Sequence, residues 1–134
     1  MKDRIFVIDG SSYLYRAYHA MPPLSTSSGQ PTGAVKGVTN MLMNLKKDSE
    51  GSSIIVVFDA KGKTFRSDIY SEYKANRPPM PDELRDQLLP VKSICRAIGF
   101  PLIEIDGVEA DDVIATIAKM AKDANYKCVI SSLD

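Results

Sequence analysis

The feature that most constrains the fold is the run of five apolar residues Ile54–Phe58, which lies between Ser53 and Asp59. A continuous run of this length, rich in β-branched residues, is typical of a strand buried on both faces. Three further short runs have strand composition, and they are Arg4–Ile8, Pro101–Ile105 and Lys127–Ser131. Because a doubly buried strand needs a helix layer on each side, the run predicts an α/β architecture.

Segments with helical periodicity alternate with these strands. Apolar residues recur at intervals of three and four in Ala34–Lys47, Asp82–Ile98 and Ala110–Ala124, and a shorter helix is expected over Ser12–Ala20. The alternation predicts a three-layer domain, in which a parallel sheet is flanked by helices. The 134 residues suit one domain, and we expect residues 1–134 to form a single one.

Composition limits the class of protein. The chain is 44% hydrophobic and 25% charged with a formal net charge of zero, which is ordinary for a soluble globular protein. It has no signal-peptide pattern and no membrane span, so we expect a cytoplasmic protein without a membrane partner. Cys95 and Cys128 are too far apart for a CxxC motif and predict buried thiols in a reducing compartment.

A cluster of carboxylates marks the start of the last predicted helix. Glu109, Asp111 and Asp112 fall within four residues, and Asp106 lies just before them. Carboxylates this close repel one another unless a cation compensates, and an oxygen-only set favours Mg²⁺ or Mn²⁺. The alternative is that acids in a first helical turn cap its amides and complement its dipole, each contributing ~0.3–1 kcal/mol. That alternative explains one or two of these acids better than all of them.

An acidic residue also follows each of the other strands. Asp9 ends the first, Asp59 the second and Asp134 the fourth. Ligands of an open parallel sheet bind at the carboxyl ends of its strands, so these side chains are expected along one edge. Each alone could be a turn residue. Together they predict a metal site in which two ions ~4 Å apart assist phosphodiester hydrolysis.

Basic and aromatic residues supply a surface for a polyanion. Residues 61–77 carry five bases against two acids, and Lys63 and Arg66 are among the bases. Tyr70, Tyr73, Lys74 and Arg77 have near-helical spacing, and such a face stacks on bases and contacts phosphates, although a surface helix gives the same pattern. Arg16 is expected on the first helix within reach of a bound phosphate. His19 is the only histidine and is expected to be exposed or packed rather than a catalytic base.

Four collinear motifs carry a family resemblance over the whole chain. They are Val7-Ile-Asp-Gly-Ser-Ser-Tyr-Leu-Tyr-Arg-Ala-Tyr-His19, Val57-Phe-Asp-Ala-Lys-Gly-Lys-Thr-Phe-Arg66, Tyr73-Lys-Ala-Asn-Arg-Pro-Pro-Met-Pro81 and Gly107-Val-Glu-Ala-Asp-Asp-Val-Ile114. The chain resembles the N-terminal 5′→3′ exonuclease domains of bacterial DNA polymerase I, in the flap-endonuclease family with its PIN-like α/β core. The resemblance implies metal-dependent hydrolysis of DNA near a 5′ end, nick or flap, with two Mg²⁺ or Mn²⁺ ions, in DNA replication and repair.

The resemblance also implies residue roles. The family's metal-binding carboxylates are matched by Asp9, Asp59, Glu109, Asp111, Asp112 and Asp134. The family's basic residues that contact the scissile phosphate are matched by Arg16, Lys74 and Arg77, and the aromatic residue beside them is matched by Tyr73. Thr32 and Gly33 match the loop and helix start that touch the DNA backbone. It further implies a nucleoid-associated monomer, which a polymerase domain can follow.

Two departures from the family pattern bear on activity. Leu133 stands where the family has glycine, and a branched side chain there is expected to disturb a tight turn. The sequence stops at Asp134, before the next aspartate of the motif and before the helix–hairpin–helix region, so we expect only the N-terminal part of the domain. Two alternatives remain: a PIN-type ribonuclease, against which the 73–81 motif argues, and a catalytically incomplete DNA-binding fragment.

Overall fold

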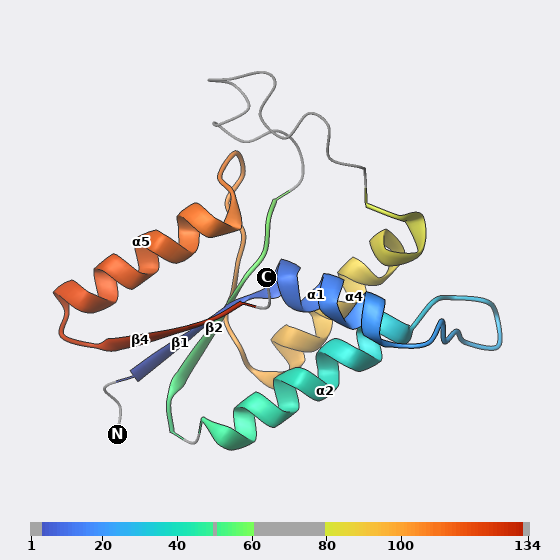
Figure 1. Cartoon of the computed structure of the whole chain (residues 1–134), viewed down its shortest axis with the longest axis horizontal. Helices are drawn as coiled ribbons and strands as arrows, with labels where there is room; N and C mark the ends of the chain where they lie inside the picture. The colour runs from blue at the N-terminus through green and yellow to red at the C-terminus, as the bar shows by residue number, and fades with distance from the viewer. Residues whose placement is uncertain (1–3, 50, 61–79, 133–134) are drawn as a thin grey trace.

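The computed structural model describes residues 4–49, 51–60 and 80–132. The elements follow one another as β1 (Arg4–Asp9), α1 (Gly10–Ala20), α2 (Gly33–Asp48), β2 (Ser53–Val57), α4 (Asp82–Ile98), β3 (Leu102–Ile103), α5 (Ala110–Asp123) and β4 (Lys127–Ser131) (Figure 1). Each strand and helix expected from the sequence is present, with ends that differ by a few residues. None of the helices in these ranges is long and apolar enough to cross a membrane.

The four described strands form one sheet in the order β3-β2-β1-β4, and every neighbouring pair is parallel. In the register, Asp9 of β1 lies opposite Val57 of β2, and Ile8 lies opposite Ser131 of β4. The carboxyl ends of β1, β2 and β4 are therefore level with one another. This places Asp9 and Asp59 at one edge of the sheet, as the sequence predicts, whereas Asp134 lies outside the described residues.

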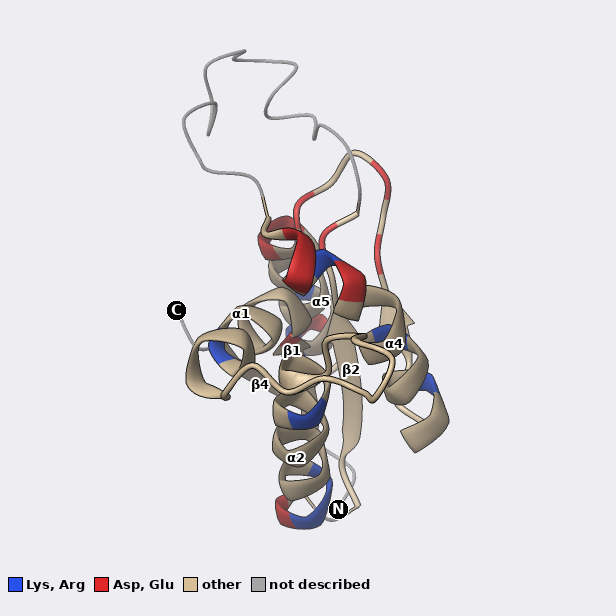
Figure 2. Ribbon diagram, turned by 90° about the vertical axis from the view of Figure 1, so that its right-hand side faces the viewer, with Lys and Arg blue, Asp and Glu red and all other residues tan. Residues whose placement is uncertain are grey.

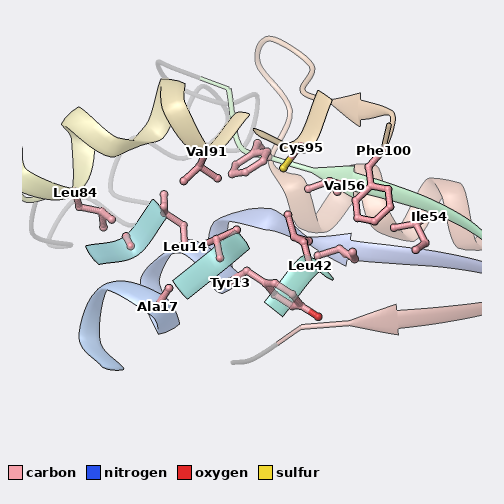
Figure 3. Packing of buried hydrophobic residues seen from close by; sticks show 14 residues of the cluster. Tyr13, Leu14, Ala17, Leu42, Ile54, Val56, Leu84, Val91, Cys95 and Phe100 are labelled. Atoms are coloured by element: carbon pink, nitrogen blue, oxygen red, sulfur yellow. The ribbon is translucent and has the colours of Figure 1, made fainter. Parts of the chain in front are cut away.

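Helices cover both faces of the sheet, which confirms the three layers. Figure 1 shows α1, α2 and α4 on one side and α5 on the other. Alternate residues of β1 point to the two sides, because Ile8 belongs to the core cluster with α1, α2 and α4, whereas Val7 packs with Val113 and Ile114 of α5. The larger cluster joins the helix layer to the sheet through Leu14, Leu42 and other side chains that Figure 3 shows in contact.

Close helix packing fixes α1 against α2, and a side chain of α4 completes the start of α2. A Cβ at Gly37 would lie 2.7 Å from the Cβ of Ala17, so only glycine permits this approach. Thr32, the N-cap of α2, makes no side-chain capping bond. Instead the Val35 amide donates to Oε1 of the buried Gln87 at 2.9 Å, and Gln87 Nε2 donates to the Glu83 carbonyl at 3.0 Å. This cap from a neighbouring helix is not visible in the sequence pattern.

The third strand is shorter than predicted. The run Pro101–Ile105 is expected to be extended throughout, but β3 contains only Leu102–Ile103. Beyond it the Glu104 carboxylate pairs with the Lys92 ammonium of α4 at 2.6 Å, and Ile105 is 47% exposed. The strand therefore ends at Ile103, and Ile105 does not extend it.

The fourth strand is less buried than its composition predicts. Among the described strands β4 pairs only with β1, so it lies at an edge of the sheet. Ile130 is 50% exposed although it shares the α5 side of β4 with the half-buried Cys128. Apolar composition alone does not separate a central strand from an edge strand.

Both cysteines are free thiols, in agreement with the sequence-based expectation, although Cys128 is only half-buried. Cys95 on α4 has no exposed surface. Burial disfavours the thiolate and raises the pKa of Cys95 from the ordinary 9.0 to about 11. Burial also raises the pKa of the Cys128 thiol.

Because the Cys95 thiol is buried, we expect the free energy of unfolding to fall at alkaline pH. Because its pKa is higher in the folded chain than in the unfolded chain, its contribution is complete below pH 9 and is lost as the pH rises through about 11. The free energy of unfolding should fall by roughly 2–3 kcal/mol from this group over that interval. Urea unfolding at several pH values should show a shallower fall in Cys95→Ala than in Cys128→Ala. Equal slopes in both variants would contradict the assignment.

Candidate active site

Asp9 is a buried carboxylate at the junction of the central strand and the first helix. It ends β1, caps α1 and is 5% exposed. Its Oδ1 accepts the Ser12 amide at 3.1 Å, and its Oδ2 accepts the Ser132 hydroxyl at 3.3 Å. Burial of a carboxylate is unfavourable without such donors. The sequence Asp9-Gly10 therefore holds an anion at the carboxyl edge of the sheet.

The three residues after Asp9 each make a different contact. A Cβ on Gly10 would lie 2.7 Å from the Phe58 ring, so the strand-to-helix turn packs directly on that ring. Ser11 Oγ accepts the Asp59 amide at 3.2 Å, and the Ser12 hydroxyl donates to the Asp9 carbonyl at 3.3 Å. The start of α1 is thereby joined to the segment that follows β2.

Asp59 joins β2 to the acidic turn at the start of α5. Its Oδ1 accepts the Ala110 amide at 2.7 Å, a short bond from the first residue of the helix. Glu109, the N-cap of α5, makes no side-chain capping bond of its own. Asp59, which follows β2, therefore provides the cap, and its negative charge complements the helix dipole.

The predicted acidic cluster lies on the first turn of α5 and just before it. Glu109 is buried at 7% exposure, Asp112 is half-buried and Asp111 is exposed. The positions of Asp111 and Asp112 agree with the dipole alternative, since both stand in the first turn. That alternative does not explain the burial of Glu109. The turn is held next to the end of β2 by the Asp59 bond.

The structure brings the segments that carry the carboxylates together, but its described residues do not form a complete set of metal ligands. Hydrogen bonds link the end of β1 to the end of β4, and the end of β2 to the starts of α1 and α5. Within residues 4–49, 51–60 and 80–132, no group of three or more His, Cys, Asp or Glu side chains is close enough to hold one ion. Asp134, a predicted ligand, and Leu133 lie outside the described residues.

The predicted DNA-contacting residues lie partly within the described chain. Arg16 is exposed on α1, about 10 Å along the helix from Asp9 at 1.5 Å per residue, and it borders a cavity of about 340 Å³ between α1 and α2. Thr32 caps α2 and Gly33 is its first residue, buried against the Pro22 carbonyl. The others, Lys63, Arg66, Tyr73, Lys74 and Arg77, lie outside the described residues, as does Tyr70.

The exposure of His19 agrees with the sequence-based expectation, whereas the predicted basic segment 61–77 lies outside the described residues. The imidazole is exposed and contacts the rings of Tyr15 and Tyr18. Figure 2 shows acidic residues around the first turn of α4 and along the loop that leads to α5, and a further acidic residue beside the bases at the end of α2. The basic residues of α2 lie toward the other end. Among the described residues, acids are thus prominent around the start of α4 and the loop before α5, with Arg85 among them.

The sequence of this chain matches a known protein family. Residues 4–134 match the family described as 5′-3′ exonuclease, N-terminal resolvase-like domain. The chain belongs to this family.

Relatives of the exonuclease family cover almost the whole chain but are much longer. The chain is 58% identical to DNA polymerase I of Pseudomonas aeruginosa over 97% of its own length and 14% of the relative's. It is 45% identical to a 5′-3′ exonuclease of Aquifex aeolicus, again over 97% of the chain, and spans 45% of that protein. The chain therefore spans less than half the length of these curated relatives.

A solved structure supports the exonuclease fold. A T5 protein co-crystallized with metal ions matches at a TM-score of 0.72 and 26% identity, covering 98% of this chain and 48% of the T5 chain. Together with the parallel sheet and its two helix layers, this likeness confirms the PIN-like α/β core expected for the family.

Several contacts of the candidate site were not predicted from the sequence. They involve Ser11, Ser12, Ser131, Ser132 and Asp59 as a cap. The adjacent serines after Asp9 and at the end of β4 were visible in the sequence, but nothing in their spacing indicates which strand end each one contacts. Only the register of β1 against β2 and β4 decides it.

Two substitutions of Asp59 should separate the contribution of its hydrogen bond to stability from that of its charge. Asp59→Ala removes the acceptor of the Ala110 amide and should lower the free energy of unfolding by about 1 kcal/mol. Asp59→Asn keeps an acceptor and should lose only a few tenths of that amount, roughly 0.3 kcal/mol. Urea unfolding in EDTA measures both, with Asp86→Ala on the exposed face of α4 as the control. Equal losses in the Ala and Asn variants would contradict the cap.

Proposed function

We propose that this chain is part of a metal-dependent 5′→3′ exonuclease and flap endonuclease that hydrolyses DNA phosphodiesters near 5′ ends. The observation that carries the proposal is the buried Asp9 carboxylate, held by two donors at the carboxyl edge of the sheet. Two relatives named DNA polymerase I and 5′-3′ exonuclease support it over 97% of the chain.

The chemistry of the donor set fits a hard divalent cation. Every side chain proposed as a ligand offers carboxylate oxygens, which suit Mg²⁺ or Mn²⁺. The ligands proposed are Asp9, Asp59, Glu109, Asp111, Asp112 and Asp134. Of these, Asp59 has one oxygen engaged by the Ala110 amide, so its other oxygen is the better placed for an ion. Co-crystallization of the related T5 protein with metal ions supports the proposal of an ion, and two ions are proposed for the complete site.

The chain's own groups are proposed to hold and orient the DNA. When bound, the ions supply an activated water and stabilise the leaving oxygen of the phosphodiester. Asp9 and Glu109, both buried, keep a fixed negative charge at the edge, while the exposed Asp111 is accessible from solvent. Lys74 and Arg77 are proposed to stabilise charge on the phosphate, with Arg16 assisting.

The DNA is proposed to run over the loop and helix start at Thr32 and Gly33. Amides at a helix N-terminus attract phosphate oxygens. Lys63, Arg66 and Tyr73 are proposed to contact the DNA by ion pairing and stacking. The proposed substrates are DNA with a 5′ flap, nick or 5′ end, and we propose a cytoplasmic, nucleoid-associated monomer, joined to a polymerase domain in relatives of the DNA polymerase I type.

One observation favours a second candidate function. Because the described residues gather no group of three potential ligands, a catalytically incomplete DNA-binding domain is the alternative for this stretch. Such a chain would bind flap DNA in EDTA and in Mg²⁺ alike, without cutting it.

Cleavage of defined substrates tests the proposal. A 5′-labelled flap DNA is incubated with the chain in Mg²⁺, Mn²⁺ or EDTA, beside a single-stranded RNA of the same sequence. Cleavage of the DNA near the junction, in either metal but not in EDTA, is expected. Binding without cleavage would favour the incomplete domain, and preferential cleavage of the RNA would favour a PIN-type ribonuclease.

A further inference from the structure

Two adjacent serines at the end of β4 contact the start of α1 in different ways. Ser131 Oγ lies 2.5 Å from the Tyr13 hydroxyl, so this pair binds the strand to the buried side of the helix. Ser132 Oγ donates to Asp9 Oδ2 at 3.3 Å and lies 3.5 Å from Ser12 Oγ. The first contact joins two structural elements, and the second is directed at the carboxylate of the proposed site.

The Ser132 contact restricts the orientation of Asp9. The Ser12 amide binds Oδ1 and the Ser132 hydroxyl binds Oδ2, so a donor holds each oxygen. A carboxylate rotates readily about its last bond when only one oxygen is bound. With both bound, its plane is fixed, and each oxygen still has a lone pair that can accept a cation.

We propose that Ser132 is a positioning residue for metal binding, which acts by holding the Asp9 carboxylate in the orientation that an ion requires. This inference rests on the proposed function, because it assumes that Asp9 is a ligand. Hydrogen-bond partners of metal ligands fix ligand geometry, and their loss typically weakens metal affinity on the order of 10- to 100-fold.

The neighbouring serine provides a matched control. Ser131→Ala deletes the same hydroxyl at the same strand end, but the bond lost is the one to Tyr13. If the serines only fasten β4 to α1, both alanine variants should change stability and neither should change metal affinity selectively. If Ser132 orients Asp9, its variant alone should bind metal more weakly.

Mn²⁺ binding to the full chain, followed by electron paramagnetic resonance, separates these cases. The expected result is affinity about tenfold weaker in Ser132→Ala, restored in Ser132→Thr and unchanged in Ser131→Ala. Ser132→Cys keeps the side-chain size while weakening the donor, so it gives the same test if the alanine variant does not fold. Circular dichroism checks folding in each case.

Each other outcome contradicts the inference in a recognisable way. Wild-type affinity in Ser132→Ala, or an equal loss in both alanine variants, would overturn the positioning role and leave the proposed function intact. A wild-type chain that binds no Mn²⁺ would overturn the positioning role together with the proposed site. A loss in Ser132→Ala that threonine does not restore would show that the hydroxyl is not the cause.

Discussion

Asp111→Ala should reduce Mg²⁺-dependent cleavage of flap DNA by at least the order of 10³-fold, or about 4 kcal/mol of transition-state stabilisation. Asp111 stands in the first turn of α5, which Asp59 fastens to the end of β2. Its side chain is exposed, so it is accessible to an ion and contributes little to the core. Loss of the helix-dipole interaction should lower the free energy of unfolding by only about 0.3–1 kcal/mol.

The control for this variant comes from the other end of the same helix. Asp123 is an exposed aspartate in the last turn of α5 and pairs with Lys119 at 3.4 Å. Asp123→Ala should keep cleavage within about twofold, because surface ion pairs contribute ~0–1 kcal/mol and this one lies far from the proposed site. Single-turnover rates at saturating Mg²⁺ measure both. A folded Asp111→Ala chain that cleaves at the normal rate would rule out its role as a ligand.

Phe58→Ala should lower the free energy of unfolding by about 3–5 kcal/mol, the largest effect expected from one core substitution. The ring is 1% exposed and packs on the backbone of Gly10, where an added Cβ would lie 2.7 Å away. The Lys92 ammonium lies 5.5 Å from the centroid of the ring. Removing the ring leaves a cavity beneath the turn that carries Asp9. The loss is large beside the roughly 5–15 kcal/mol that stabilises a typical domain.

Urea unfolding of Phe58→Ala measures this loss, and Met43→Ala on α2 provides the comparison. Met43 is 48% exposed, so its truncation should change the free energy of unfolding by less than about 1 kcal/mol. Phe58→Leu should recover more than half of the alanine loss, because most of the buried volume returns. A Phe58→Ala chain as stable as Met43→Ala would contradict the packing of the Asp9 turn on the ring.

The layers of the fold were predictable because the apolar pattern is strong where both faces of a strand are buried. Val56 and Val57 in β2 belong to different core clusters. Because both faces of β2 are buried, the run Ile54–Phe58 is continuously apolar. The pattern was weaker at the sheet edges. It extended β3 to Ile105, although the strand ends at Ile103. The apolar composition of β4 also did not show that Ile130 is half exposed.

The site was predictable at the level of segments, and less so at the level of side chains. An acid after each strand correctly placed Asp9 and the Glu109 turn at one edge, because parallel strands share a direction. It did not show that Asp59 accepts a hydrogen bond from the first amide of α5, or that Ser132 donates one to Asp9. Both contacts join residues more than 50 positions apart, and their partners depend on strand register and helix position that sequence spacing does not contain.

The central claim is that carboxylates at the carboxyl edge of the sheet hold the ions. Anomalous diffraction from crystals of the chain soaked in Mn²⁺ tests it directly. The account predicts a Mn²⁺ peak between Asp9 and the first turn of α5, with metal–oxygen distances of about 2.1 Å to carboxylate oxygens. Mn²⁺ peaks found only elsewhere on the molecule, or no peak at that edge in crystals of the folded chain, would contradict it.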